Sequence, residues 1–346
     1  MEHVETGAAH APTRRARLTL AFRILVSAVL LAILISNIEL DNVVPRERSL
    51  STLGWLAAAL AMAAIGIVLS AWRWQRVIDA FGIRVPLRRL TTYYFAGQFV
   101  GNALPSTIGG DVVRVARAAK DVGGTETAFA TVALERLTGF LALPVLSLVG
   151  FALDPSLLDS STAWVALLID GVALAALSAI LFLAGHPRAA GRFRDHENWT
   201  RFLGAVHEGI TYLRSDREQV LGVLFTAFVY QVSVIATVGF LVLTLDTGVP
   251  FAALVAFIPA VAMAQVIPIS LSGLGVREST LVLLLTPLGI PHGRAVGLGL
   301  AWYATMLIVS LAGAPAFAVG NRAAAGAAAS AVTLEHNPET TADAPE

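Results

Sequence analysis

The sequence contains no cysteine and few charged residues. Only 14% of its 346 residues are charged, and its 24 basic and 24 acidic side chains leave no net charge. The missing cysteine excludes disulfide frameworks, cysteine-ligated zinc and iron–sulfur clusters. The absence of a basic excess argues against a nucleic-acid partner. Soluble domains carry about 25% charged residues, so we expect an all-α polytopic membrane protein.

Apolar stretches recur along the whole chain. Six are long enough to cross a hydrocarbon core of about 30 Å, at residues 18–38, 53–71, 127–153, 163–185, 220–245 and 295–320. No small-residue cleavage site follows the first stretch, which favours a retained anchor over a signal peptide. Residues 93–119 and 251–288 are also apolar but interrupted. We predict six full spans plus two broken or re-entrant helical hairpins, and eight or more spans with broken helices is the alternative.

Basic residues are distributed unequally between the loops. Eighteen lie on one side of the predicted spans, including Arg73 at the start of the loop after 53–71, and three lie on the other. Because cytoplasmic loops are enriched in Lys and Arg, we predict an inner-membrane protein with both termini in the cytoplasm.

The predicted transmembrane domain covers residues 18–320, with a cytoplasmic tail at 1–17 and a disordered tail at 321–346. A cytoplasmic loop at 186–219 contains apolar residues at helical spacing between positions 199 and 213. This pattern is typical of an amphipathic helix, which either lies on the membrane surface or packs as a small cytoplasmic helix.

The two interruptions resemble each other. PSTIGGDVVR begins at Pro105 and PISLSGLGVR at Pro268, and they agree at the proline, one glycine, one valine and the final arginine. Together with the charge-derived topology, this predicts inverted halves at about 53–153 and 220–320. Such repeats with broken helices indicate a transporter site near the membrane midplane, although proline and glycine also occur as tolerated kinks.

The first break has features suited to an anion. Gly109 and Gly110 permit backbone conformations that other residues resist, and Asp111 is placed to cap a helix over 112–119. Free N–H groups at that helix start, with Arg114 one turn later, would favour an anion such as a lipid phosphate. A purely structural cap is the alternative.

Further charges lie within the apolar segments. A charge near the bilayer centre costs about 2.5–3.5 kcal/mol, so it usually faces a cavity or a partner. Glu135 and Arg136 point about 100° apart on a helix and should have different partners. The candidates are Arg114 or Arg277 for Glu135, and Asp111 or Glu278 for Arg136. Asp170 is a lone acid and the weaker candidate.

No cofactor, metal or catalytic motif is evident. The seven histidines lie in predicted tails and loops without metal-ligand spacing, and no P-loop, dinucleotide fingerprint or nucleophile elbow is present. We therefore expect no bound cofactor, no metal and no catalytic residues.

The motifs PSTIGGDVVRVARAAK, ALERLTGF and QVIPISLSGLGVRES resemble, in that order, the transmembrane region of lysylphosphatidylglycerol synthases, whose stand-alone members are called flippase-like proteins. The resemblance implies a lipid-translocating domain of two inverted halves. Because only a short polar tail follows the last span, we do not expect lysyl transfer. With Ser106 from the first break, the implied substrate site comprises Pro105, Ser106, Gly109, Gly110, Asp111, Arg114, Glu135, Arg136, Pro268, Ser270, Gly273, Gly275, Arg277 and Glu278.

Three functions are consistent with these features. The leading hypothesis is translocation of an anionic or glycosylated lipid between the two broken-helix elements. The alternative is a membrane-embedded transferase acting on a lipid-linked substrate, with Asp111 or Glu135 as general base. A third is a non-catalytic partner that binds a separate cytoplasmic synthase through residues 186–219.

Overall fold

The computed structural model describes residues 49–103, 109–185, 206–207, 209–210, 216–266 and 272–316. Every regular element in these ranges is helical: α2 (Leu50–Ala80), α3 (Leu87–Ala103), α4 (Gly109–Ala118), α5 (Thr125–Leu153), η2 (Pro155–Asp159), α6 (Ala163–Gly185), α9 (Arg217–Leu245), α10 (Phe251–Ala264), α11 (Val276–Leu285), η3 (Thr286–Leu288) and α12 (His292–Ser310). Within the described ranges, α2, α5, α9 and α12 are long and apolar enough to cross a membrane. The all-helical membrane class is therefore confirmed.

The helices follow the predicted apolar stretches, with some differences at their ends. The stretches at 53–71, 127–153, 163–185 and 220–245 correspond to α2, α5, α6 and α9. The last stretch was expected to reach residue 320, but α12 ends at Ser310. The predicted span at 18–38 lies outside the described residues, so the count of six spans stays a prediction.

Polar caps explain where two long helices begin. The Ser49 side chain accepts a hydrogen bond from the Thr52 amide (3.3 Å) at the start of α2. At the start of α9, the Asp216 carboxylate accepts from the amides of Glu218 (2.9 Å) and Gln219 (3.3 Å). These bonds satisfy amides that have no partner inside the helix.

The two interrupted regions each form a pair of helices. Residues 93–119 fold into α3 and α4, while residues 251–288 fold into α10 and α11. The ten-residue helices α4 and α11 are each about 15 Å long at 1.5 Å per residue, or half the thickness of the bilayer core. They are too short to cross it alone.

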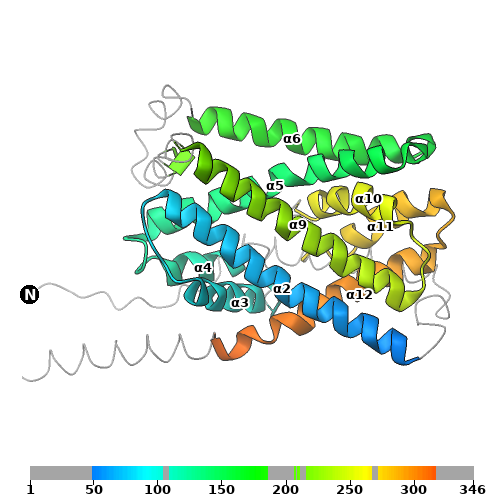
Figure 1. The fold of residues 1–346 in the computed structure, drawn as a ribbon, viewed down its shortest axis with the longest axis horizontal. Coiled ribbons are helices and arrows are strands. Elements are labelled where there is room, and N and C mark those ends of the chain that lie inside the picture. Colours follow the sequence, from blue (N-terminus) through cyan, green and yellow to red (C-terminus); the bar gives the residue numbers. More distant parts are fainter. Residues whose placement is uncertain are drawn as a thin grey trace, which may run out of the picture.

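Helices α2 and α9 run antiparallel side by side and make the most extensive contact in the molecule (Figure 1). The pair α3 and α4 lies toward one end of them, and α10 and α11 lie toward the other (Figure 1). Helix α5 packs against α10, and α6 covers them both from outside.

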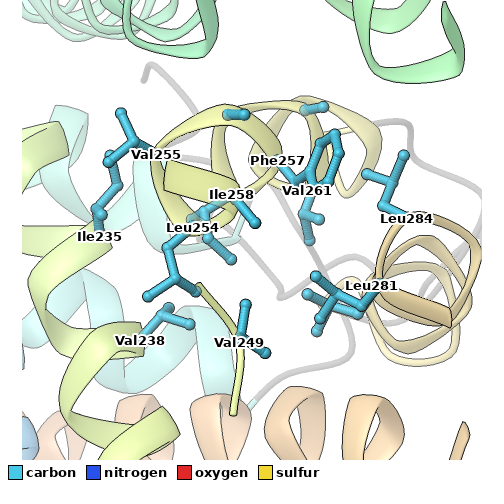
Figure 2. Packing of buried hydrophobic residues seen from close by; sticks show 14 of the residues in the cluster. Ile235, Val238, Val249, Leu254, Val255, Phe257, Ile258, Val261, Leu281 and Leu284 are labelled. Atoms are coloured by element: carbon cyan, nitrogen blue, oxygen red, sulfur yellow. The ribbon is translucent and has the colours of Figure 1, made fainter. Parts of the chain in front are cut away.

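Two apolar clusters hold the bundle together. The larger centres on α10, where Leu254, Phe257 and Val261 pack among side chains from α9 and α11 (Figure 2). The second joins α2, α3, α4 and α5 around the fully buried Trp74. The candidate site lies between elements of these two clusters.

Two expectations about polar segments need separate comment. Arg73 was placed in a cytoplasmic loop, which is wrong, because α2 continues to Ala80 and the Arg73 residue is only 4% exposed.

Of the predicted amphipathic helix at 199–213, only residues 206, 207, 209 and 210 are described. Val206 and Ile210 are buried against α2, α5 and α9, so this part packs on the bundle.

Candidate functional site

The α3–α4 hairpin is closed by glycine contacts. A Cβ atom added to Gly110 would lie 2.5 Å from the Gly97 carbonyl oxygen, and one added to Gly97 would lie 2.7 Å from the Gly110 carbonyl oxygen. The two backbones therefore touch where no other residue fits. Gly109 and Gly110 are already helical, so the expectation that they supply an unusual backbone conformation is wrong. The structural role of Gly110 is to let the backbone of α4 come close to that of α3.

Asp111 does not cap α4 as expected. The helix begins two residues earlier, at Gly109, so Asp111 lies in its first turn. Its carboxylate instead accepts hydrogen bonds from Arg114 (3.2 Å) and Arg136 (2.9 Å). The carboxylate thereby links α4 to α5.

Glu135 is the centre of a fully buried ion cluster. Arg114 Nη2 donates to its Oε2 atom (3.0 Å), and Arg73 Nε donates to its Oε1 atom (2.8 Å), with Arg73 Nη2 also paired to Oε1. Glu135 is 0% exposed, and both arginines are less than 5% exposed. The cluster ties α2, α4 and α5 together. The sequence offered Arg114 or Arg277 as the partner of Glu135, and in the structure the partner is Arg114.

Arg136 has a more open position than Arg73 and Arg114. Its Nε atom lies 2.5 Å from Asp111 Oδ2, and 47% of its side chain is exposed. The sequence offered Asp111 or Glu278 as the partner of Arg136, and in the structure the partner is Asp111. Neighbouring residues on α5 thus do face different partners, and Arg136 is the one that a ligand can reach.

Aromatic rings cover the buried guanidinium groups. Arg114 lies over the rings of Tyr94 (4.0 Å) and Trp74 (4.4 Å), while Arg73 lies over Tyr230 (4.7 Å). The π faces attract the cations, and they add to the stabilisation from the carboxylates where water is absent.

The second break has a matching arginine. Gly275, at φ 84°, precedes α11, and its amide donates to Glu278 Oε2 (2.6 Å). Arg277 Nη2 donates to Oε1 of the same carboxylate (2.7 Å), and its guanidinium lies 5.7 Å from the Trp302 ring and 5.3 Å from the Tyr303 ring. Arg277 and Arg114 therefore share two features: an acidic partner and an aromatic pair.

A cavity of about 500 Å³ lies between the two sets of elements. Its wall includes Asp111, Arg114 and Arg136 from α4 and α5, with Arg277 from α11. The wall also includes uncharged polar and aromatic side chains: Tyr94, Gln98, Asn102, Phe140, Tyr230, Gln265, Ser272, Trp302 and Tyr303. A second cavity of about 190 Å³ shares Arg136 with the first and also contacts Arg73.

The structure divides the sequence-derived candidates into four groups. Gly110, Asp111, Arg114, Arg136 and Arg277 line the larger cavity, and Glu135 and Glu278 lie behind its arginines. Gly109, Gly273 and Gly275 shape the neighbouring backbone. Pro105, Ser106, Pro268 and Ser270 lie outside the described residues.

Sequence analysis missed Arg73 and the aromatic and amide side chains of the wall. A signal for them existed, because tyrosine, tryptophan and glutamine interrupt the middle of apolar stretches, as at Tyr230 and Gln231 or at Trp302 and Tyr303. Within the described ranges, no group of three histidine or acidic residues is placed to hold a metal ion.

Comparison with known protein families places the chain in one of them. A family model described as the lysylphosphatidylglycerol synthase transmembrane region matches residues 20–313. No curated protein matches the chain significantly. The matched range includes every element that contributes to the cavity.

Proposed function

The chain belongs to the lysylphosphatidylglycerol synthase transmembrane family, and from that premise we propose that it translocates an anionic or glycosylated lipid across the cytoplasmic membrane. The lipid headgroup enters the cavity between the two broken-helix elements while its hydrocarbon chains stay in the bilayer. The observation that carries the proposal is a basic cavity of about 500 Å³ inside an apolar helical bundle.

The charges around the cavity favour an anion. Four arginines (Arg73, Arg114, Arg136 and Arg277) are balanced by three carboxylates (Asp111, Glu135 and Glu278), which leaves one positive charge. Arg114 and Arg277 have side chains only 3–4% exposed, whereas Arg136 is 47% exposed. A phosphate therefore meets Arg136 first.

Asp111 holds Arg136 when no headgroup is bound. The pair is partly exposed, with Asp111 at 20%, so a phosphate can replace the carboxylate as the partner of Arg136. Asp111 keeps a second partner in Arg114 (3.2 Å) and is not left uncompensated. Amide and aromatic side chains in the wall then supply hydrogen bonds and apolar contact to the uncharged part of the headgroup.

The helix contacts support two inverted halves. Helix α2 of the first half lies antiparallel to α9 of the second. The last helix of each half contacts the broken region of the other half: α5 packs on α10, and α12 packs on α3. Each break is followed by a short helix that carries an arginine, Arg114 on α4 and Arg277 on α11. In the proposed mechanism one half rocks against the other, and the cavity between them opens to alternate sides.

The transferase alternative has less support. It requires a carboxylate that is free to accept a proton from a substrate. Glu135 is fully buried between two arginines, and Asp111 is engaged by Arg114 and Arg136. Both carboxylates are thus occupied in stabilising cations.

The experiment is translocation by the purified protein in proteoliposomes. Tail-labelled phosphatidylglycerol, phosphatidylcholine and a polyprenyl-phosphate sugar are followed by their accessibility to a membrane-impermeant reductant. We expect faster exchange of the anionic or glycosylated probes than of phosphatidylcholine. Arg136→Ala should slow this exchange by about 10- to 150-fold, the equivalent of one charge-assisted hydrogen bond worth about 1.5–3 kcal/mol.

Arg89→Ala is the matched control, because Arg89 pairs with Asp121 on the surface and is 56% exposed. It should exchange lipid like the wild type. Equal rates for wild type, Arg136→Ala and empty liposomes with every probe would contradict the proposed function. If a folded Arg136→Ala protein exchanged lipid at the wild-type rate, Arg136 would have no role in the mechanism.

A further inference from the structure

A buried acid lies outside the cavity, on helix α6. Asp170 is 4% exposed, and neither of its carboxylate oxygens has a hydrogen-bond partner. It shares one face of α6 with Ala163, Ala166 and Leu177, all of them buried, while Trp164 on the opposite face is 62% exposed. The acid therefore points into the bundle from a helix whose other side meets lipid.

Among the residues that the structure describes, no charged group compensates Asp170. It is the only charged residue of α6, and α10 has no titratable side chain. On α5 the nearest charge is Arg136, eleven residues before the neighbouring Ser147 and thus about 16 Å away along the helix. On α11, Arg277 and Glu278 pair with each other (2.7 Å).

The connection before α6 does not supply a partner either. Its acids, Asp154 and Asp159, lie beyond the start of the helix, at least seven residues or about 10 Å from Asp170. The neighbouring hydroxyl is also occupied, because Ser147 donates its hydrogen to the Ala256 carbonyl (2.8 Å). An ionised carboxylate with no partner costs several kcal/mol when buried, so burial of Asp170 favours the neutral acid.

The acid lies where the two halves meet. Its neighbour Ser147 bridges α5 to α10, and one turn further along α5 the backbone of Gly150 packs directly against Ala256. Six residues beyond Ala256, about 9 Å along α10, Ala262 reaches the cavity wall. A shift of α10 against α5 therefore changes the cavity and the surroundings of Asp170 together.

We propose that Asp170 is a proton-binding site that couples the movement of α10 against α5 to proton uptake and release. The closed contact holds the carboxylic acid form. When α10 moves and water reaches the acid, the O–H bond breaks, the proton leaves to water and the carboxylate is hydrated. Return to the closed contact requires one proton to bind again. This inference rests on the proposed translocation.

The first measurement is independent of transport. The infrared spectrum of the purified protein at neutral pH should contain the carbonyl stretching band of a protonated carboxylic acid, and Asp170→Asn should lose that band. The control is Asp159→Asn, a change at an exposed acid in η2, which should retain it. A wild-type spectrum without the band, or a band that persists in Asp170→Asn, would overturn the proposal.

The second measurement is translocation in proteoliposomes at a series of pH values. Wild-type and Asp159→Asn rates should vary with pH, by up to about tenfold per unit for one proton, whereas Asp170→Asn rates should be independent of pH. The same pH dependence in Asp170→Asn and wild type would overturn the coupling. Absence of translocation in the wild type at every pH would instead contradict the proposed function, and the infrared band would still decide whether Asp170 holds a proton.

Discussion

The buried cluster around Glu135 allows a quantitative test of the fold. Glu135→Gln keeps the size of the side chain but removes the carboxylate that contacts Arg73. Arg73 would then lose its carboxylate partner, while Arg114 and Arg136 would keep Asp111. Breaking a buried pair by removing one partner costs about 3–5 kcal/mol, because a charge is left uncompensated.

A surface pair in the same protein supplies the control. Arg89 and Asp121 are 2.6 Å apart, and the arginine is 56% exposed. Exposed pairs contribute about 0.2–1 kcal/mol, so Asp121→Asn should be nearly neutral. Unfolding by SDS in mixed micelles, followed by circular dichroism, compares the two variants. We expect Glu135→Gln to lower the free energy of unfolding several times more than Asp121→Asn.

A double variant separates lost charge balance from lost packing. Arg73→Leu combined with Glu135→Leu removes one cation and one anion together, leaving Arg114, Arg136 and Asp111 with the original net charge. Because apolar residues often replace a buried pair at little cost, the double variant should recover much of the stability lost in Glu135→Gln. Equal stability of Glu135→Gln and Asp121→Asn would refute the reasoning, because the buried Glu135 would then contribute no more to the free energy of unfolding than a surface ion pair does.

Two further predictions concern packing at the cavity. Gly110→Ala should open the α3–α4 hairpin and reduce lipid exchange at least as strongly as Arg136→Ala, because its Cβ would lie 2.5 Å from the Gly97 carbonyl oxygen. Gly171→Ala on α6, where a Cβ meets nothing within 4 Å, should fold and exchange lipid normally. Trp302→Ala should destabilise the protein by about 3–5 kcal/mol in the same SDS titration, because the ring is 5% exposed and its loss leaves a cavity. Trp164→Ala, which alters a ring that is 62% exposed, should change stability by less than about 1 kcal/mol, and equal losses in the two tryptophan variants would contradict the packing argument.

Periodicity and charge explain how far the sequence could be interpreted. Long apolar stretches predict helices well, because a segment that crosses a bilayer must pair its own backbone N–H and C=O groups, and a helix does so. The same reasoning predicts that Glu135 and Arg136, being embedded, need partners. It could not choose between Arg114 and Arg277 for Glu135, because that choice depends on how α4 and α11 are placed around α5, and placement is set by tertiary packing.

Two errors have a common physical cause. Arg73 follows an apolar stretch and is succeeded by more polar residues, a pattern typical of a helix end at the membrane surface. Asp111 follows two glycines, a pattern typical of a cap. Arg73 lies inside its helix because the neighbouring helix α5 supplies Glu135 as its partner. Helix α4 begins before Asp111, at the point where Gly110 packs against Gly97 of α3. Local pattern alone contains neither contact.

The arrangement of the four arginines indicates how one cavity can both be stable and bind an anion. Arg73, Arg114 and Arg277 are buried with carboxylates and aromatic rings, so their charges contribute to structure. Arg136 differs from them because both its own side chain and that of its partner Asp111 are partly exposed. Because the buried cluster keeps one excess positive charge, an anionic headgroup that takes the place of Asp111 at Arg136 gains attraction from the whole cluster without separating any buried pair. Under the proposed function, binding and folding use different arginines, so a variant at Arg136 should alter lipid exchange while leaving stability nearly unchanged.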